Sequence, residues 1–129
     1  MHQLYTVDDL EVARLRFPGV KIIAHPECPT DVAESSDFSG STSQMSGYIA
    51  ESKAEKVMLL TECSMGDNLQ SEFPSTEFIR SCQSCPHMKK ITLEKILASV
   101  ETETYEVEVP DHVIAGAQKS LNRMLEIGR

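Results

Sequence analysis

The sequence has little positive charge and lacks a long apolar run. Its 129 residues carry 12 Lys and Arg against 20 Asp and Glu, a formal net charge of -8. Without a basic stripe to neutralise a phosphate backbone, nucleic acid and anionic membranes are poor partners. No apolar run reaches the roughly 18 to 20 residues that span a bilayer, and residues 1–4 lack the basic flank and apolar stretch of a signal peptide. These absences predict a soluble, cytoplasmic chain.

Cysteine is sparse and poorly placed for a self-contained metal site. The four cysteines are Cys28, Cys63, Cys82 and Cys85. A cytoplasmic chain with its own hydrophobic core neither needs disulfides nor keeps them oxidised, which favours metal binding or redox chemistry. Cys82 and Cys85 form a CxxC pair, but no second pair completes a zinc tetrahedron. A metal bound here would need ligands from elsewhere.

Short apolar runs alternate with helical patterns along the chain. Strands are predicted at residues 20–24, 56–60 and 77–79, with a half-exposed strand at 105–109. Helices are predicted from Thr6 to about residue 16, from a Thr30 cap to about 35, over 44–54, as a short turn at 68–73, from Thr92 to about 100, and over 111–127. The alternation indicates an α/β fold, a three-layer α/β/α sandwich with a short parallel sheet.

Three polar motifs follow the ends of predicted strands. They are HPEC at residues 25–28, TECSMGD at 61–67 and CQSCP at 82–86. Because ligands of open parallel sheets bind beyond the carboxyl ends of the strands, these motifs define the candidate site.

His25 and Glu27 flank a proline in the first of these motifs. An imidazole and a carboxylate at one strand end can share acid and base work near neutral pH, or they can cap a loop and face solvent. Glu62 could accept a hydrogen bond from a ligand or from a loop amide.

Residues 39–42, SGST, precede a predicted helix. The hydroxyls of Ser41 and Thr42, together with the backbone N–H groups of a helix start, can bind a carboxylate or phosphate. An ordinary N-cap is the alternative.

Cys85 stands directly before Pro86, a pairing that recurs in iron-sulfur sites. The pattern leaves three alternatives open, which are cluster ligation, a dithiol switch with Cys82, and an inert thiol. Cys28 and Cys63 have no such context, and core packing is their expected role.

Taken together and in order, the motifs at residues 25–28, 39–42, 61–65 and 82–89 resemble the quinolinate synthase family. The resemblance continues through residues 92–94 and 122–125, so it covers nearly the whole chain. It implies a longer enzyme of three similar α/β domains related by a pseudo-threefold axis. Residues 1–98 would form the third domain, and residues 99–129 would be a strand and helix that return to a missing first domain.

The resemblance also implies chemistry. Family members condense iminoaspartate with dihydroxyacetone phosphate to quinolinate in NAD biosynthesis, releasing phosphate and water, and use a 4Fe-4S cluster as Lewis acid. One cysteine from each domain ligates the cluster.

By resemblance, the cluster ligand in this chain is Cys85, and Cys82 is a neighbour that could form a disulfide with it or supply a second ligand. His25 and Glu27 correspond to the catalytic pair, which also contacts substrate, while Ser41, Thr42 and Glu62 correspond to substrate-binding positions.

A family cysteine that precedes the histidine matching His2 lies outside this chain, as do the first two domains. The fragment alone is therefore expected to be inactive and without cluster. The alternatives are a stand-alone α/β anion-binding module and a CxxC thiol redox module. The terminal helix, deprived of its partner, could form a homodimer.

Overall fold

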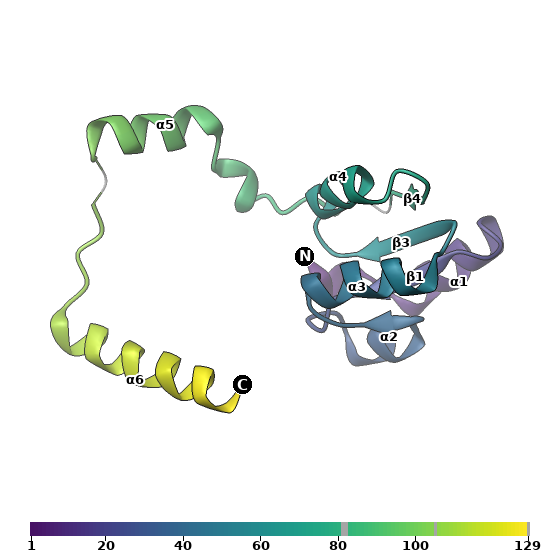
Figure 1. Cartoon of the computed structure of the whole chain (residues 1–129), viewed down its shortest axis with the longest axis horizontal. Helices are drawn as coiled ribbons and strands as arrows, with labels where there is room; N and C mark the ends of the chain where they lie inside the picture. The colour runs from purple at the N-terminus through teal and green to yellow at the C-terminus, as the bar shows by residue number, and fades with distance from the viewer. Residues whose placement is uncertain (81–82, 105, 129) are drawn as a thin grey trace. The chain divides into compact units, whose positions relative to one another are not determined.

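The computed structural model describes residues 1–80, 83–104 and 106–128 of the chain (Figure 1). Its packing divides into two compact units, Met1–Lys90 and Ile91–Arg129. Each unit is described by itself. No helix among the described residues is long and apolar enough to cross a membrane.

A four-stranded parallel sheet forms the centre of the first unit. Strands β1 (Lys21–Ala24), β2 (Phe38–Ser39), β3 (Lys56–Leu60) and β4 (Glu77–Ile79) are arranged in the order β2-β1-β3-β4. The predicted parallel pairing of β1 with β3 is confirmed, with Ala24 opposite Leu60. From this central pair the chain continues to β2 on one side and to β4 on the other. The strand order therefore reverses between β1 and β3, the position at which open α/β sheets bind ligands.

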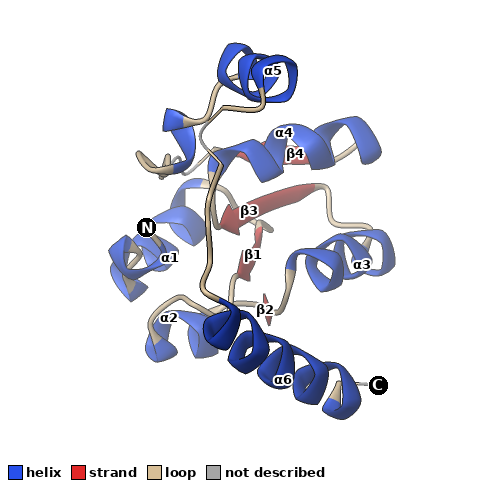
Figure 2. Ribbon diagram, turned by 90° about the vertical axis from the view of Figure 1, so that its left-hand side faces the viewer, coloured by secondary structure: helices blue, strands red, loops and turns tan. Residues whose placement is uncertain are grey.

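Helices cover both faces of the sheet (Figure 2). Helices α1 (Val7–Arg16) and α2 (Thr30–Ser35) pack on one face, and α3 (Thr42–Ser52) and α4 (Cys63–Glu72) pack on the other. One core contains Leu10, Val32, Ile22 and Leu60, while the other contains Ile23, Met45, Ile49, Leu59 and Leu69. The alternation of side chains along β1 sends Ile22 and Ile23 to opposite cores, as expected of a strand buried on both faces. The predicted three-layer α/β/α fold is confirmed.

Hydrogen bonds at the helix starts explain where two helices begin. Thr6 and Asp9 form a capping box that opens α1, as the sequence predicts, and Ser41 and Gln44 form one that opens α3. Helix α3 thus begins earlier than the predicted residue 44. The predicted Thr30 cap of α2 is wrong, because Pro29 occupies the N-cap and Thr30 is already helical. Pro29 takes only the backbone part of the N-cap role, since its carbonyl accepts from the Ala33 N–H at 2.9 Å and no side-chain hydrogen bond caps the helix.

Helix α4 is longer than the short turn predicted at residues 68–73. It begins at Cys63 because the Glu62 carboxylate occupies the N-cap and accepts a hydrogen bond from the Ser64 N–H at 2.8 Å. Glutamate is not among the preferred N-cap residues, so the sequence does not predict that the helix begins here.

The second unit contains helices α5 (Leu93–Thr102), capped by Thr92 as predicted, and α6 (Asp111–Ile127). The strand predicted at 105–109 is wrong for residues 106–109, which form no regular structure, and Tyr105 lies outside the described residues. A short alternating segment becomes a strand only when a neighbouring strand pairs with it. The assignment of residues 1–98 to a third domain and of 99–129 to a returning segment stays a prediction. Two short 3-10 turns, His2–Leu4 and Met88–Lys90, complete the elements of the described chain.

Candidate functional site

The strand register brings the sequence motifs to one edge of the sheet. Ala24 pairs with both Ser39 and Leu60, so the segments that begin at His25, Gly40 and Thr61 leave their strands at the same level. An isolated parallel bridge between Glu62 and Gln83 continues the β3–β4 side of this edge. The predicted location beyond the carboxyl ends of the strands is therefore where the structure places the motifs.

Two histidines and a carboxylate cluster at this edge. The rings of His2 and His25 stack with centroids 4.6 Å apart and an angle of 13° between their planes. His2 Nδ1 lies 2.9 Å from Glu27 Oε2, a hydrogen bond that becomes an ion pair when His2 is protonated. His25 and Glu27, the pair singled out from the sequence, are thus in one cluster with a third residue that sequence reasoning did not select.

The hydrogen bond to His25 fixes its neutral tautomer. The Glu27 backbone N–H donates to His25 Nδ1 at 3.3 Å. A nitrogen that accepts cannot carry the proton, so the neutral ring holds its proton on Nε2. His25 can therefore present an N–H donor to a ligand and, once that proton is transferred or the ring is protonated, can act in acid or base steps.

His2 is held from two sides. Its Nε2 lies 3.2 Å from Thr61 Oγ1, opposite the contact with Glu27. Thr61 is itself fixed, because the Tyr5 hydroxyl donates to its backbone carbonyl at 3.0 Å. His2 and Thr61 are separated by 59 positions in the sequence, so no local pattern could have joined them. The match of His2 to a family histidine was the available signal.

The same cluster has the composition of a metal site. One ligand atom from each of His2, His25 and Glu27 can be chosen so that all lie within 4.8 Å of one another. Two imidazoles and a carboxylate can bind a divalent transition metal, and they can equally surround a polar substrate group.

The predicted anion-binding turn opens α3. The Ser41 hydroxyl oxygen accepts from the Gln44 N–H at 3.4 Å, and Gln44 Oε1 accepts from the Ser41 N–H at 2.9 Å. Ser41 therefore performs the N-cap role, yet its hydroxyl proton is not used in either bond. Thr42, the first residue of α3, is exposed beside it.

Glu62 contacts the segment that carries Cys85, through a backbone bridge to Gln83 and an ion pair with Lys89. Its carboxylate is buried, with Oε2 bonded to the Ser64 N–H and Oε1 3.6 Å from the Lys89 ammonium. Burial alone would raise the pKa of Glu62, but the N–H groups of Ser64 and Cys85 and the Lys89 charge together lower the pKa below its ordinary value. Glu62 is therefore a carboxylate at neutral pH.

The cysteines differ in their surroundings. Cys85 is half-buried in the loop beyond the sheet edge, and Cys82 lies outside the described residues. Cys28 packs in the core, as expected, where Sγ contacts the Leu60 carbonyl at 3.4 Å and burial raises the pKa of the thiol. A raised pKa disfavours the thiolate that a metal needs. Cys63, at the start of α4, is half-buried like Cys85.

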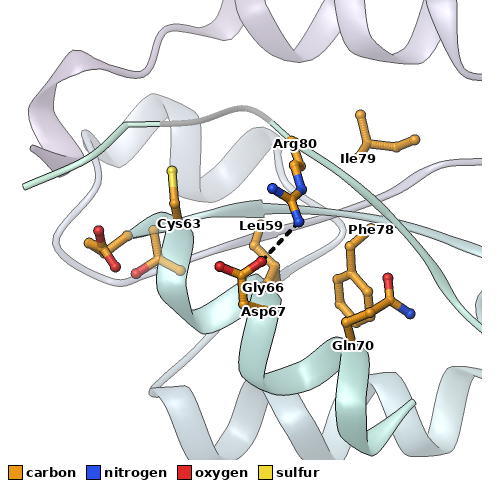
Figure 3. Close-up of a pocket in the computed structure, with 10 residues that line it drawn as sticks. Leu59, Cys63, Gly66, Asp67, Gln70, Phe78, Ile79 and Arg80 are labelled. Atoms are coloured by element: carbon orange, nitrogen blue, oxygen red, sulfur yellow. Dashed lines mark hydrogen bonds and ion pairs between the residues drawn. The ribbon is translucent and has the colours of Figure 1, made fainter. Parts of the chain in front are cut away.

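A small cavity of about 50 Å³ lies between α4 and β4, with Cys63 and Arg80 among the residues that line it (Figure 3). Arg80 pairs with Asp67 at 2.9 Å. Ligand pockets are typically about 300–1,000 Å³, so this space suits a few water molecules.

These features define a class of protein, an α/β sandwich domain with an acid-base cluster at the switch point of its parallel sheet and a cysteine-bearing loop beside it. Comparison with known proteins identifies the family. The family described as Quinolinate synthetase A protein matches residues 1–126. The chain belongs to this family.

The chain is similar in sequence to three quinolinate synthases from bacteria. The chain is 46% identical to a quinolinate synthase from Agrobacterium fabrum over 98% of its own length and 37% of that protein. It is also 46% identical to one from Xylella fastidiosa, over 98% of the chain and 38% of the relative. With one from Caulobacter vibrioides it shares 43% identity over 98% of the chain and 35% of the relative. The chain spans little more than a third of the length of these relatives, so it corresponds to a fragment of them.

Proposed function

We propose that this chain forms part of a quinolinate synthase, which condenses iminoaspartate with dihydroxyacetone phosphate to quinolinate, phosphate and water in NAD biosynthesis. The observation that carries the proposal is the cluster of His2, His25 and Glu27 at the switch point of the sheet, in a chain that belongs to the family.

His25 and Glu27 suit the proton transfers of this reaction. Forming a pyridine ring from these substrates requires loss of water and removal of protons from carbon. The Nε2 proton of His25 is directed away from its bond to the Glu27 N–H, so it can be donated to a departing hydroxyl. Glu27, bonded to His2 through Oε2, can accept a proton or orient a substrate amine. Such general acid-base groups contribute about 10²- to 10⁴-fold in rate.

Ser41 and Thr42 suit the charged ends of the substrates. Helix α3 has 11 residues, so the positive end of its dipole favours a carboxylate or phosphate beside the Ser41 hydroxyl. The sequence also predicts Glu62 as a substrate contact, and a raised KM in Glu62→Gln would support that role.

Cys85 is the proposed thiolate ligand of a 4Fe-4S cluster, with Cys82 as a further candidate. Such a cluster, when bound, would supply a Lewis acid that polarises a substrate oxygen and eases dehydration. Cys85 is favoured over Cys28 because Cys85 lies in the loop beyond the sheet edge with a half-buried side chain, whereas the thiol of Cys28 is in the core.

The remaining ligands would come from the part of the enzyme that this chain does not contain. We therefore propose that the fragment by itself binds no cluster and makes no quinolinate. The missing N-terminal domains are its proposed partners, and in their absence the exposed apolar face of α6 could join two copies.

Activity in a complete enzyme tests the proposal. In a chimera, residues 1–126, the range that matches the family, replace the corresponding segment of the Agrobacterium fabrum relative, and quinolinate is measured anaerobically. We expect the chimera to be active, His25→Ala and Glu27→Gln each to lower kcat by at least about 100-fold, and Glu34→Gln, an exposed carboxylate on α2, to have no effect. Full activity in both of the first two variants would contradict the assigned roles.

A further inference from the structure

Glu62 is an unusual carboxylate within the first unit. It is 8% exposed, and its Oε1 has neither accessible surface nor a hydrogen-bond partner among the described residues. A buried charge is costly unless it is paired. The nearest opposite charge is Lys89 Nζ, 3.6 Å from Oε1, which comes from the segment that follows Cys85.

A set of contacts ties this segment to the start of α4. Lys89 Nζ donates to Ser64 Oγ at 2.9 Å, while the Ser64 N–H donates to Glu62 Oε2 at 2.8 Å. On the other side of Cys85, Gln83 bridges to the backbone of Glu62. The cysteine therefore lies between two anchors that both end at Glu62.

The segment is also closed on itself. The Lys89 backbone N–H donates to the Cys85 carbonyl at 3.1 Å, and residues 88–90 form a 3-10 turn. A shift of Lys89 would therefore move the backbone of Cys85.

We propose that Glu62 is a positioning residue, which acts through Ser64 and Lys89 to hold residues 83–89 so that Cys85 stays at the sheet edge. The proposal rests on the proposed function only for what Cys85 ligates. The anchoring itself is a property of this chain and can be measured without any cluster.

Three substitutions separate the parts of the anchor. Glu62→Gln keeps an oxygen for the Ser64 N–H but removes the charge that faces Lys89. Lys89→Met removes the opposite charge from an exposed side chain, 56% accessible, so it leaves the core intact. Glu62→Ala removes both contacts, including the bond to the Ser64 N–H that caps α4. Matched controls are Glu72→Gln, at the other end of the same helix, and Lys119→Met, on α6.

The first measurement is hydrogen-deuterium exchange of the 129-residue chain, with circular dichroism as the check on folding. We expect the Lys89 and Lys90 amides, which donate to the carbonyls of Cys85 and His87, to exchange about tenfold faster in Lys89→Met, because this variant loses a charge-assisted hydrogen bond to Ser64. In Glu62→Gln, which loses an ion pair at 3.6 Å, the same amides should exchange at least about twofold faster. Glu62→Ala should exchange faster still, and the two controls should match the wild type. Unchanged exchange in both single-charge variants would overturn the proposal.

The second measurement uses the chimera and separates positioning from substrate contact. We expect Glu62→Gln to lower iron per chain and kcat in proportion, with KM unchanged. A raised KM at full iron content would overturn the positioning role and assign Glu62 to the substrate. If the wild-type chimera makes no quinolinate, the proposed function fails, while the exchange result still decides whether Glu62 anchors the loop.

Discussion

Gly40 is the position at which a single added methyl group should disturb the sheet edge most. A Cβ built there would lie 2.7 Å from Phe38 Cε1, 2.9 Å from Phe38 Cζ and 3.0 Å from Gln44 Cβ. Carbon atoms pack best at about 3.5–4.0 Å, so the Phe38 ring would have to retreat. That ring is stacked on Tyr48 with centroids 4.7 Å apart, which blocks an easy shift.

Gly40→Ala should therefore destabilise the fold. Overpacking of this kind costs about 1–3 kcal/mol. Gly47→Ala is the matched control in the following helix, because a Cβ there meets nothing within 4 Å. Alanine is favoured over glycine inside a helix by roughly 0.5–1 kcal/mol, so the control should be more stable than the wild type. The two variants should differ by roughly 1.5–4 kcal/mol in free energy of unfolding.

Urea unfolding followed by circular dichroism measures this difference. With a slope of about 1 kcal/mol per molar urea for a small domain, the midpoint of Gly40→Ala should fall by about 1 M or more. A midpoint equal to or above that of the wild type would refute the argument from close approach. The close contact could also be relieved by a shift of the backbone before Ser41. In that case the proposed anion-binding turn at Ser41 and Thr42 should bind phosphate more weakly.

The remaining predictions concern an ion-pair network and a helix face. Asp37 accepts from the Ile22 N–H and from Lys21, so Asp37→Asn should cost about 1–2 kcal/mol at pH 7 by urea unfolding. Burial alone would raise the pKa of Asp37, but these donors lower the pKa below its ordinary value of 3.8. The stabilisation by the carboxylate is therefore present above pH 3.8, and the difference in unfolding free energy between wild type and Asp37→Asn should shrink as the pH falls through the lowered pKa. A difference that grows in acid would contradict this prediction. The paired substitution Leu121→Glu with Met124→Glu, at exposed positions of α6, should abolish any concentration-dependent dimer seen by sedimentation, and a dimer that persists would place the contact elsewhere.

The central strands were predictable because their signals are local. Residues 57–60 form a continuous apolar run after Lys56, and the strand covers Lys56–Leu60 as predicted. Strand β2 is missing from the prediction because it consists of Phe38 and Ser39 alone, too short for any periodicity. The start of α4 was missed because its N-cap is Glu62, whose carboxylate is held by burial and by Lys89. Serine, threonine, aspartate and asparagine are the residues that predict an N-cap from the sequence.

The site was predictable in part. The topology of a parallel sheet explains why His25, Ser41 and Glu62 share an edge, since each follows the end of a strand. The role of His2 depends on a ring stack and on hydrogen bonds to Glu27 and Thr61. These contacts join segments far apart in the sequence, so they exist only after the sheet has formed.

The central claim is that this chain supplies one thiolate, Cys85, to a cluster that only the complete enzyme can hold. Anaerobic iron and sulfide analysis of the chimera and of the 129-residue chain tests it most directly. We predict a full cluster in the chimera, its loss in Cys85→Ser, its retention in Cys28→Ala and largely in Cys82→Ser, and no stoichiometric iron in the isolated chain. A chimera that keeps its cluster after Cys85→Ser, or an isolated chain that binds one, would contradict the claim.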